Sequence, residues 1–221
     1  MDILVTMSTS ERPRKRGRQA EAARNDRRLL AAAREVFTSQ GADAPVSAVA
    51  ERAGVGIATL YRRYGTKEEL LQKLTVSAAE QYSEAARTAL AAEDPWEGLA
   101  GYVRECVDFG PGSLAPIAGT VRFTPEMAEA GRVSDRLADE VVARAHAAGV
   151  LRADATTIDV FLVIEQFSRR PPVPTPADAH ARERLVALVL DGLRARPDNT
   201  DFPLPGRPPS AERYDELWRR D

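Results

Sequence analysis

The chain has 221 residues, 43% of them hydrophobic, which is enough to bury a core in one or two domains. It has a single cysteine, Cys106, and two histidines, which excludes an intramolecular disulfide and leaves too few ligands for a zinc or iron–sulfur centre. We therefore expect a protein of the reducing cytoplasm without a metal or another cofactor. No stretch approaches the roughly 18 apolar residues of a membrane span, so we expect a soluble chain with no membrane partner.

Charge is divided unevenly along the chain. Residues 1–75 contain 14 Lys and Arg against 9 Asp and Glu, and residues 76–221 contain 17 against 24, so the two parts carry formal charges of +5 and −7. This asymmetry indicates that the N-terminal part meets an anionic partner, of which nucleic acid is the commonest.

Apolar residues recur at helical spacing throughout, and no window alternates as a strand does, so the sequence predicts an all-α fold. Prolines gather in residues 171–176 and 197–209, while Pro95 and Pro125 stand just inside helix starts. The nine or more predicted helices include residues 20–39, 47–53, 57–64, a long helix that opens at a Thr66 capping box, 95–109, 114–122, 125–148, 156–168, 177–196 and a short tail helix at 210–219.

Residues 46–67 form the most informative segment. Two short amphipathic helices joined by a tight turn at Gly54 predict a helix-turn-helix, whose second helix fits the major groove of DNA. We expect an inward face that packs on the first helix, made of Val49, Ala50, Ala53, Val55, Leu60 and Tyr64. The outward face then consists of Ile57, Ala58, Thr59, Tyr61, Arg62 and Arg63. An exposed Ile beside Thr, Tyr and two Arg side chains suits thymine methyls and phosphates.

At these residues the chain resembles the DNA-binding domain of the TetR family of bacterial transcriptional regulators, over roughly residues 24–74. The matching positions are Phe37 and Gly41, Ala53-Gly54-Val55, Thr59-Leu60-Tyr61, and Tyr64 with Lys67. Two positions depart from the family pattern. Gly56 replaces the usual Ser that caps the recognition helix, which we expect to cost roughly a few tenths of a kcal/mol, and Tyr64 replaces the usual Phe.

The resemblance implies a homodimeric, all-helical repressor of double-stranded operator DNA. Its N-terminal three-helix helix-turn-helix domain binds DNA, and a larger C-terminal helical domain holds the dimer interface and a pocket for an unidentified small-molecule effector. We accordingly predict a flexible basic arm in residues 1–19, the helix-turn-helix DNA-binding domain in 20–66, the ligand-binding and dimerisation domain in 67–196, and a Pro-rich tail in 197–221.

Two kinds of DNA contact are expected. Lys67 at a helix start and Tyr61 through its hydroxyl contact phosphate, and Ser47 and Thr59 act in the same way. The base edges are approached by Ile57, Ala58, Thr59 and Arg63, since a guanidinium matches the paired acceptors of guanine. Arg62 is also part of this predicted DNA-binding set. Residues 12–18 contain five basic side chains and either enter a minor groove or form a solvated tail.

The C-terminal half gives weaker signals. Because ligand sites in helical bundles lie between helices, the candidate effector-binding residues are Trp96, Tyr102, Phe123, Met127, Phe161 and Glu165, with plain core packing as the alternative. Dimerisation is better supported. The helices at 156–168 and 177–196 carry more apolar surface than one neighbouring layer covers, and the resemblance places the dimer interface on the last two long helices.

The sequence therefore predicts a dimeric DNA-binding transcriptional regulator, a repressor that a small-molecule effector releases from its operator. One alternative is a helical ligand-binding or protein-interaction module without operator recognition. Another is a hydrolase-like enzyme with a catalytic group deep in the C-terminal bundle. The sequence has no Gly-rich phosphate loop, no Ser elbow and no His-Glu-x-x-His motif, so we expect no enzymatic activity and assign no catalytic residue.

Overall fold

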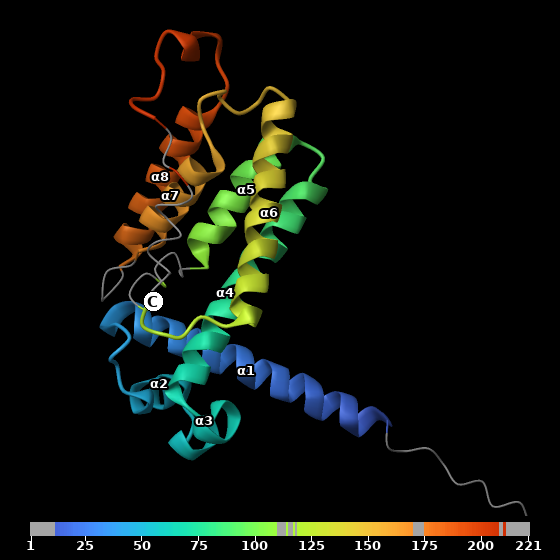
Figure 1. The fold of residues 1–221 in the computed structure, drawn as a ribbon, viewed down its shortest axis with the longest axis vertical. Helices are drawn as coiled ribbons and strands as arrows, with labels where there is room; N and C mark the ends of the chain where they lie inside the picture. Colours follow the sequence, from blue (N-terminus) through green and yellow to red (C-terminus); the bar gives the residue numbers. More distant parts are fainter. Residues whose placement is uncertain are drawn as a thin grey trace, which may run out of the picture.

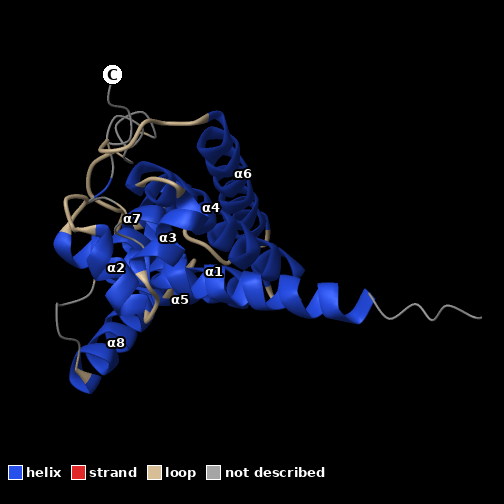
Figure 2. Ribbon diagram, turned by 90° about the horizontal axis from the view of Figure 1, so that it is seen from below, coloured by secondary structure: helices blue, strands red, loops and turns tan. Residues whose placement is uncertain are grey.

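The computed structural model describes residues 12–109, 114, 117, 119–169, 175–207 and 210, with side chains from Arg24 onward except Thr200 (Figure 1). Within these residues the regular elements are α1 (Arg12–Gln40), α2 (Val46–Ala53), α3 (Ile57–Tyr64), α4 (Lys67–Ala91), α5 (Pro95–Asp108), α6 (Pro125–Ala147), α7 (Thr157–Ser168), α8 (Pro176–Leu193) and the 3-10 helix η2 (Pro197–Thr200). Figure 2 shows helices and loops without a strand in this part of the chain. The predicted all-α fold is confirmed.

Side-chain caps explain where most of these helices begin. The hydroxyl of Thr66 accepts a hydrogen bond from the backbone N–H of Glu69 at 3.1 Å, which opens α4 as predicted. Four further helices start at an equivalent cap, namely Asp94, Thr124, Thr156 and Thr175. Each cap satisfies backbone N–H groups that have no partner within the helix.

None of the helices in the described part of the chain combines the length and apolarity that crossing a membrane requires.

Two helix boundaries differ from the sequence prediction by more than one residue, and part of one predicted helix is not helical. α1 begins at Arg12, so residues 12–19 of the predicted arm are helical, because Pro13 lies in the first turn and good helix formers follow it. α8 ends at Leu193, three residues early, because Arg194 turns to an extended conformation and pairs with Leu151. Residues 119–121 of the predicted 114–122 helix form a turn. Residues 1–11 and the tail helix, apart from Ser210, lie outside the described residues.

The buried residues form two hydrophobic clusters, and α4 belongs to both. The N-terminal cluster joins α1, α2 and α3 through Phe37, Val49 and Leu60. The C-terminal cluster is built mainly from α5, α6, α7 and α8. From α4, residues Leu70, Leu71, Leu74 and Ala78 lie in the N-terminal cluster, and Ala85, Ala86 and Ala89 lie in the C-terminal one. A shift of α4 therefore has to disturb both clusters.

The connection between α5 and α6 also reaches the N-terminal domain. Leu114 and Ile117 are buried in the N-terminal cluster, and Ile117 is only 1% exposed. The end of the connection is tied to α4, since Gln72 Nε2 donates to the carbonyl of Arg122 at 3.0 Å and Lys73 pairs with Glu126 at 2.6 Å. The α5–α6 connection thus joins the two halves of the chain side by side with α4.

Candidate nucleic-acid interface

The α2–α3 pair lies at the end of the molecule opposite to η2 (Figure 1). Gly54 ends α2 in the left-handed region, with φ of +68°, and the N–H of Val55 donates to the carbonyl of Ala50 at 3.0 Å. This tight turn sets the direction in which α3 leaves α2. Leu60 and Tyr64 then fix α3 from its buried side. The predicted helix-turn-helix has therefore formed at the predicted residues.

The N-terminus of α3 lacks a side-chain cap. Gly56 holds the cap position without a side-chain hydrogen bond, and only its carbonyl takes part, accepting from the N–H of Thr59 at 2.9 Å. The departure from the family pattern at this position thus has the structural effect expected of it. The backbone groups at the start of α3 are left with less protein capping than those at the start of α4.

The six residues predicted to face outward from α3 are all exposed. Ile57 and Tyr61 are the informative pair, because each keeps 45% of its surface exposed although both are large and apolar. Ser47 is exposed in the first turn of α2. Lys67 is half-buried, with its Nζ 5.8 Å from the centroid of the Phe37 ring. The eight predicted DNA-contacting side chains thus reach the surface around α3, and their contacts with DNA stay a prediction.

Sequence reasoning did not identify Asp26 of α1 as part of this surface. Its carboxylate receives both the Nε–H of Arg63, at 2.6 Å, and a second bond from Arg63 Nη2, while the hydroxyl of Tyr64 donates to it at 3.4 Å. This hydrogen-bonded carboxylate raises the pKa of Arg63, and burial raises the pKa of Tyr64 to about 12. The available signal was that Asp26 is the one acidic residue among four arginines in residues 24–34.

The six candidate effector-binding residues are dispersed over the C-terminal half. Trp96 and Tyr102 are packed into the C-terminal cluster, and burial raises the pKa of Tyr102. Met127 is buried near the start of α6, whereas Phe123 is 54% exposed just before it. Phe161 and Glu165 are half-buried on α7, and Glu165 pairs with Arg169 at 3.3 Å. Their assignment to an effector site stays a prediction.

Two cavities open near α7 and α8, and none of these six residues lines either of them. The larger is a groove of about 520 Å³ with mostly apolar walls, made by Leu162 and Phe167 of α7, Val189 and Leu193 of α8, and Leu204 of the tail. The smaller, of about 200 Å³, is lined mostly by charged and polar residues, among them Arg152, Asp191 and Arg196. Most of the residues that line the larger groove belong to the two helices that the sequence predicts as a dimer interface.

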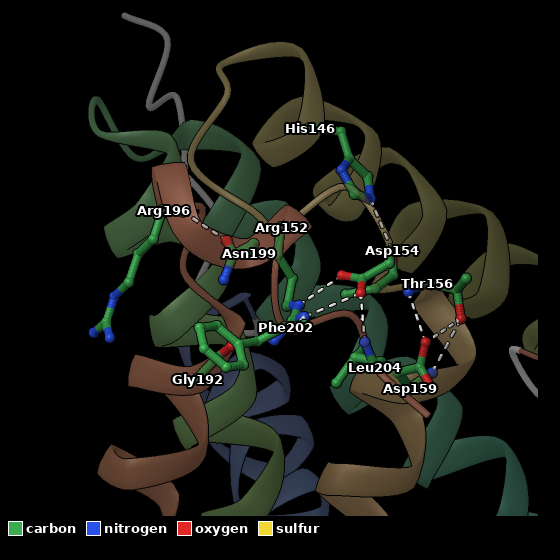
Figure 3. Close-up of polar contacts among 11 residues, drawn as sticks. His146, Arg152, Asp154, Thr156, Asp159, Gly192, Arg196, Asn199, Phe202 and Leu204 are labelled. Carbon is green, nitrogen blue, oxygen red and sulfur yellow. Dashed lines mark hydrogen bonds and ion pairs between the residues drawn. The ribbon is translucent and has the colours of Figure 1, made fainter. Parts of the chain in front are cut away.

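Arg152 lines both cavities and joins the α6–α7 loop to α8 and to the tail (Figure 3). Its guanidinium donates to Asp154 Oδ1 at 2.6 Å, to the carbonyl of Gly192 at 3.2 Å and to that of Phe202 at 2.9 Å. Asp154 also accepts the backbone N–H of Leu204 at 2.7 Å. These bonds, with that from Arg152 first, lower the pKa of Asp154 to about 2. The α6–α7 loop and residues 202–204 are therefore fastened to each other.

Two family models match the chain. The family model described as bacterial regulatory proteins, tetR family, matches residues 29–74, and the model described as transcriptional regulator SbtR-like, C-terminal domain, matches residues 94–195. A TetR transcription regulatory protein from Mycobacterium vanbaalenii is 30% identical, with a TM-score of 0.55, over 80% of this chain and 98% of its own. The chain belongs to the TetR family.

A second TetR-family structure, the transcriptional regulator SCO0520 from Streptomyces coelicolor, is 28% identical, with a TM-score of 0.56, over 77% of this chain and 98% of its own. No curated protein matches the chain significantly. As a member of the TetR family, the protein is a helix-turn-helix DNA-binding transcription regulator. That α3 is the recognition helix stays a prediction. The residues that the structure describes hold no group of three or more His, Cys, Asp or Glu side chains that could bind a metal ion.

Proposed function

We propose that this regulator is a repressor that binds a pseudo-palindromic operator as a homodimer and leaves it when a small molecule binds the C-terminal domain. The observation that carries the proposal is the two-sided character of α3. Leu60 and Tyr64 are buried, while Ile57 and Tyr61 remain exposed between polar neighbours. A soluble protein that keeps two large apolar side chains open at one helix favours a binding face there.

The side chains around α3 suit both the phosphate backbone and the base edges of a DNA duplex. Lys67 stands at the first position of α4, and Tyr61 carries a hydroxyl at the exposed face, so both suit phosphate oxygens. Ser47 and Thr59 add hydroxyls on either side of the turn, and Arg62 adds a cation. Ile57 and Ala58 at the start of α3 suit thymine methyls, because the first turn of a recognition helix meets the base edges.

The dimer is supported by the apolar surface of α7 and α8. Leu162, Leu185 and Leu188 are exposed on these helices, and the apolar groove runs between the two helices. A second copy packed on this face would make a four-helix bundle about a two-fold axis. The two α3 helices would then point in the same direction, as half-sites about one DNA turn apart require.

The proposal that an effector releases the protein from DNA is supported by α4, which contributes residues to both hydrophobic clusters. An effector that contacts Trp96 or Tyr102 has to part α5 from its neighbours, because both side chains are packed in the C-terminal cluster. Parting these helices displaces α4, whose other half lies in the helix-turn-helix core. The effector then binds the displaced form more tightly than the DNA-bound form, and this difference sets how far operator occupancy falls.

The first test selects operators from random duplex DNA and from the DNA that flanks the gene, and then measures affinity against salt. Lys67→Ala should weaken binding about tenfold for every sequence and lower the salt slope by about one, because one phosphate contact is lost. Lys73→Ala is the matched control, since Lys73 lies on the same helix but pairs with Glu126. Equal effects of the two variants, or no bound sequence at all, would contradict the proposal.

The second test concerns the dimer. Leu188→Glu should convert the protein to monomers at micromolar concentration, because it places a charge in an apolar interface. Sedimentation equilibrium measures the effect. Ile57→Glu is the control, as it introduces the same charge at an exposed apolar residue of α3 and should impair DNA binding while leaving the dimer intact. A Leu188→Glu protein that remains dimeric would rule out the α7–α8 face.

A further inference from the structure

Arg63 is the recognition-helix cation whose position is fixed from outside its own helix. Its guanidinium meets Asp26 of α1 through Nε, at 2.6 Å, and through Nη2, so that one complete edge of the planar group is occupied. Fork-to-fork pairing of this kind fixes orientation as well as distance. A long arginine side chain is thereby kept in one direction before any ligand arrives.

The pair lies at the surface rather than in the core. The side chain of Arg63 is 55% exposed and that of Asp26 is 24% exposed, so the carboxylate is the more enclosed partner and the guanidinium the more open one. The Nε edge is bonded to Asp26 of α1, so the edge made by Nη1 and the second N–H of Nη2 takes no part in this pair. That second edge has the spacing of two parallel donors, which is the pattern that matches O6 and N7 of guanine.

The charged residues near Asp26 on α1 also favour the pairing of Asp26 with Arg63. Arg24, Arg27 and Arg28 are exposed near Asp26 on α1, and no other acidic residue occurs in residues 24–34. A lone carboxylate beside a DNA phosphate would be repelled, whereas a carboxylate neutralised by Arg63 is not. Asp26 is therefore placed where it is harmless to DNA only as long as Arg63 stays bound to it.

We propose that Asp26 is a positioning residue for base reading: it holds the Nε edge of Arg63 so that the opposite edge is presented to a guanine in each operator half-site. Asp26 itself touches no DNA. This inference rests on the proposed contact between α3 and the operator, and it adds which base is read, by which edge, and what keeps that edge in place.

The experiment determines base preference in each half-site from selected random duplexes, for the full-length protein and its variants. Wild type should show a guanine preference at one position, and Arg63→Gln should abolish it. Asp26→Asn should reduce the preference at that same position about tenfold and leave the other positions unchanged, because the freed guanidinium samples several directions. In the Arg63→Gln background, Asp26→Asn should have no further effect on preference but should restore part of the affinity for all sequences, since it removes the unpaired carboxylate.

Glu35→Gln is the matched control. Glu35 is also an α1 acid that pairs with an arginine, Arg52 of α2, so its loss changes the net charge equally without touching Arg63. It should leave the guanine preference intact. Thermal unfolding of each variant shows that the fold is retained. If Asp26→Asn strengthens binding to all sequences alike and leaves every base preference unchanged, the positioning role is wrong although the operator binding stands. If no variant and no wild-type protein selects any sequence, both are wrong.

Discussion

Gly98→Ala is expected to destabilise the protein by about 3 kcal/mol, the largest effect of any single methyl group that we anticipate. A Cβ at Gly98 would lie 2.5 Å from the carbonyl oxygen of Ala89 on α4. That oxygen cannot rotate away, because it belongs to the backbone and already accepts a hydrogen bond from Arg144 Nη1 at 3.0 Å. The substitution therefore has to push α5 away from α4. Urea unfolding at neutral pH measures the loss.

Gly101→Ala is the control, three residues further along the same helix. Apart from its chain neighbours and the backbone of its own helix, no described atom lies within 4 Å of a Cβ built there. Its backbone is helical, so alanine should raise the free energy of unfolding by up to about 1 kcal/mol through helix propensity. If Gly98→Ala lowers the free energy of unfolding and Gly101→Ala raises it, the close approach of α4 and α5 at Gly98 is established. A Gly98→Ala protein as stable as Gly101→Ala would contradict it.

Arg152→Met should lower the free energy of unfolding by about 2 to 3 kcal/mol. Arg152 is buried, and its guanidinium serves the Asp154 carboxylate together with the carbonyls of Gly192 and Phe202. Methionine fills a similar volume but leaves these oxygens without their donor. Since Asp154 is itself about one-third exposed, water replaces part of the loss, which keeps the effect below that of a fully enclosed pair.

Arg196→Met is the control for this prediction, because Arg196 pairs with Asp191 in an exposed position. This substitution should lower the free energy of unfolding by less than about 1 kcal/mol. The pH dependence gives a second check. The pKa of Asp154 is lowered to about 2, so its contribution to stability is complete above the ordinary pKa near 4 and is lost as the pH falls toward 2. Arg152→Met should reduce this acid-dependent loss. An unchanged acid profile would contradict the assigned contact.

The helix-turn-helix was predictable because its signals are local. Gly54 marks the turn, the inward and outward residues alternate with helical period, and Thr66 caps the next helix, so α3 was predicted at its observed bounds. The fact that Ile57 and Tyr61 are exposed followed from the same pattern. The bounds and the exposed face of α3 follow from these local signals, whereas the packing beneath it also uses distant residues, namely those of α1 and Leu114 and Ile117 of the α5–α6 connection.

What the sequence did not predict depends on distant pairs. Asp26 and Arg63 are 37 residues apart, and their contact follows from the angle between α1 and α3 rather than from spacing within either helix. The same holds for α8, which ends early because Arg194 meets Leu151 of another segment. In the C-terminal half, helical periodicity identifies which residues are apolar but not which neighbour each one meets. That is why two residues chosen for the same candidate site lie in different surroundings: Trp96 is packed in the core, whereas Phe123 is exposed.

The α5–α6 connection has a consequence for how regulators of this type can be recombined. Because Leu114 and Ile117 fill part of the hydrophobic cluster under α1, α2 and α3, the DNA-binding half is not a portable module. A fragment cut after residue 75 would carry a hole where these two side chains belong. A chimera that joins this helix-turn-helix domain to the C-terminal domain of another regulator therefore has to include the α5–α6 connection of this chain, or a segment that fills the same space.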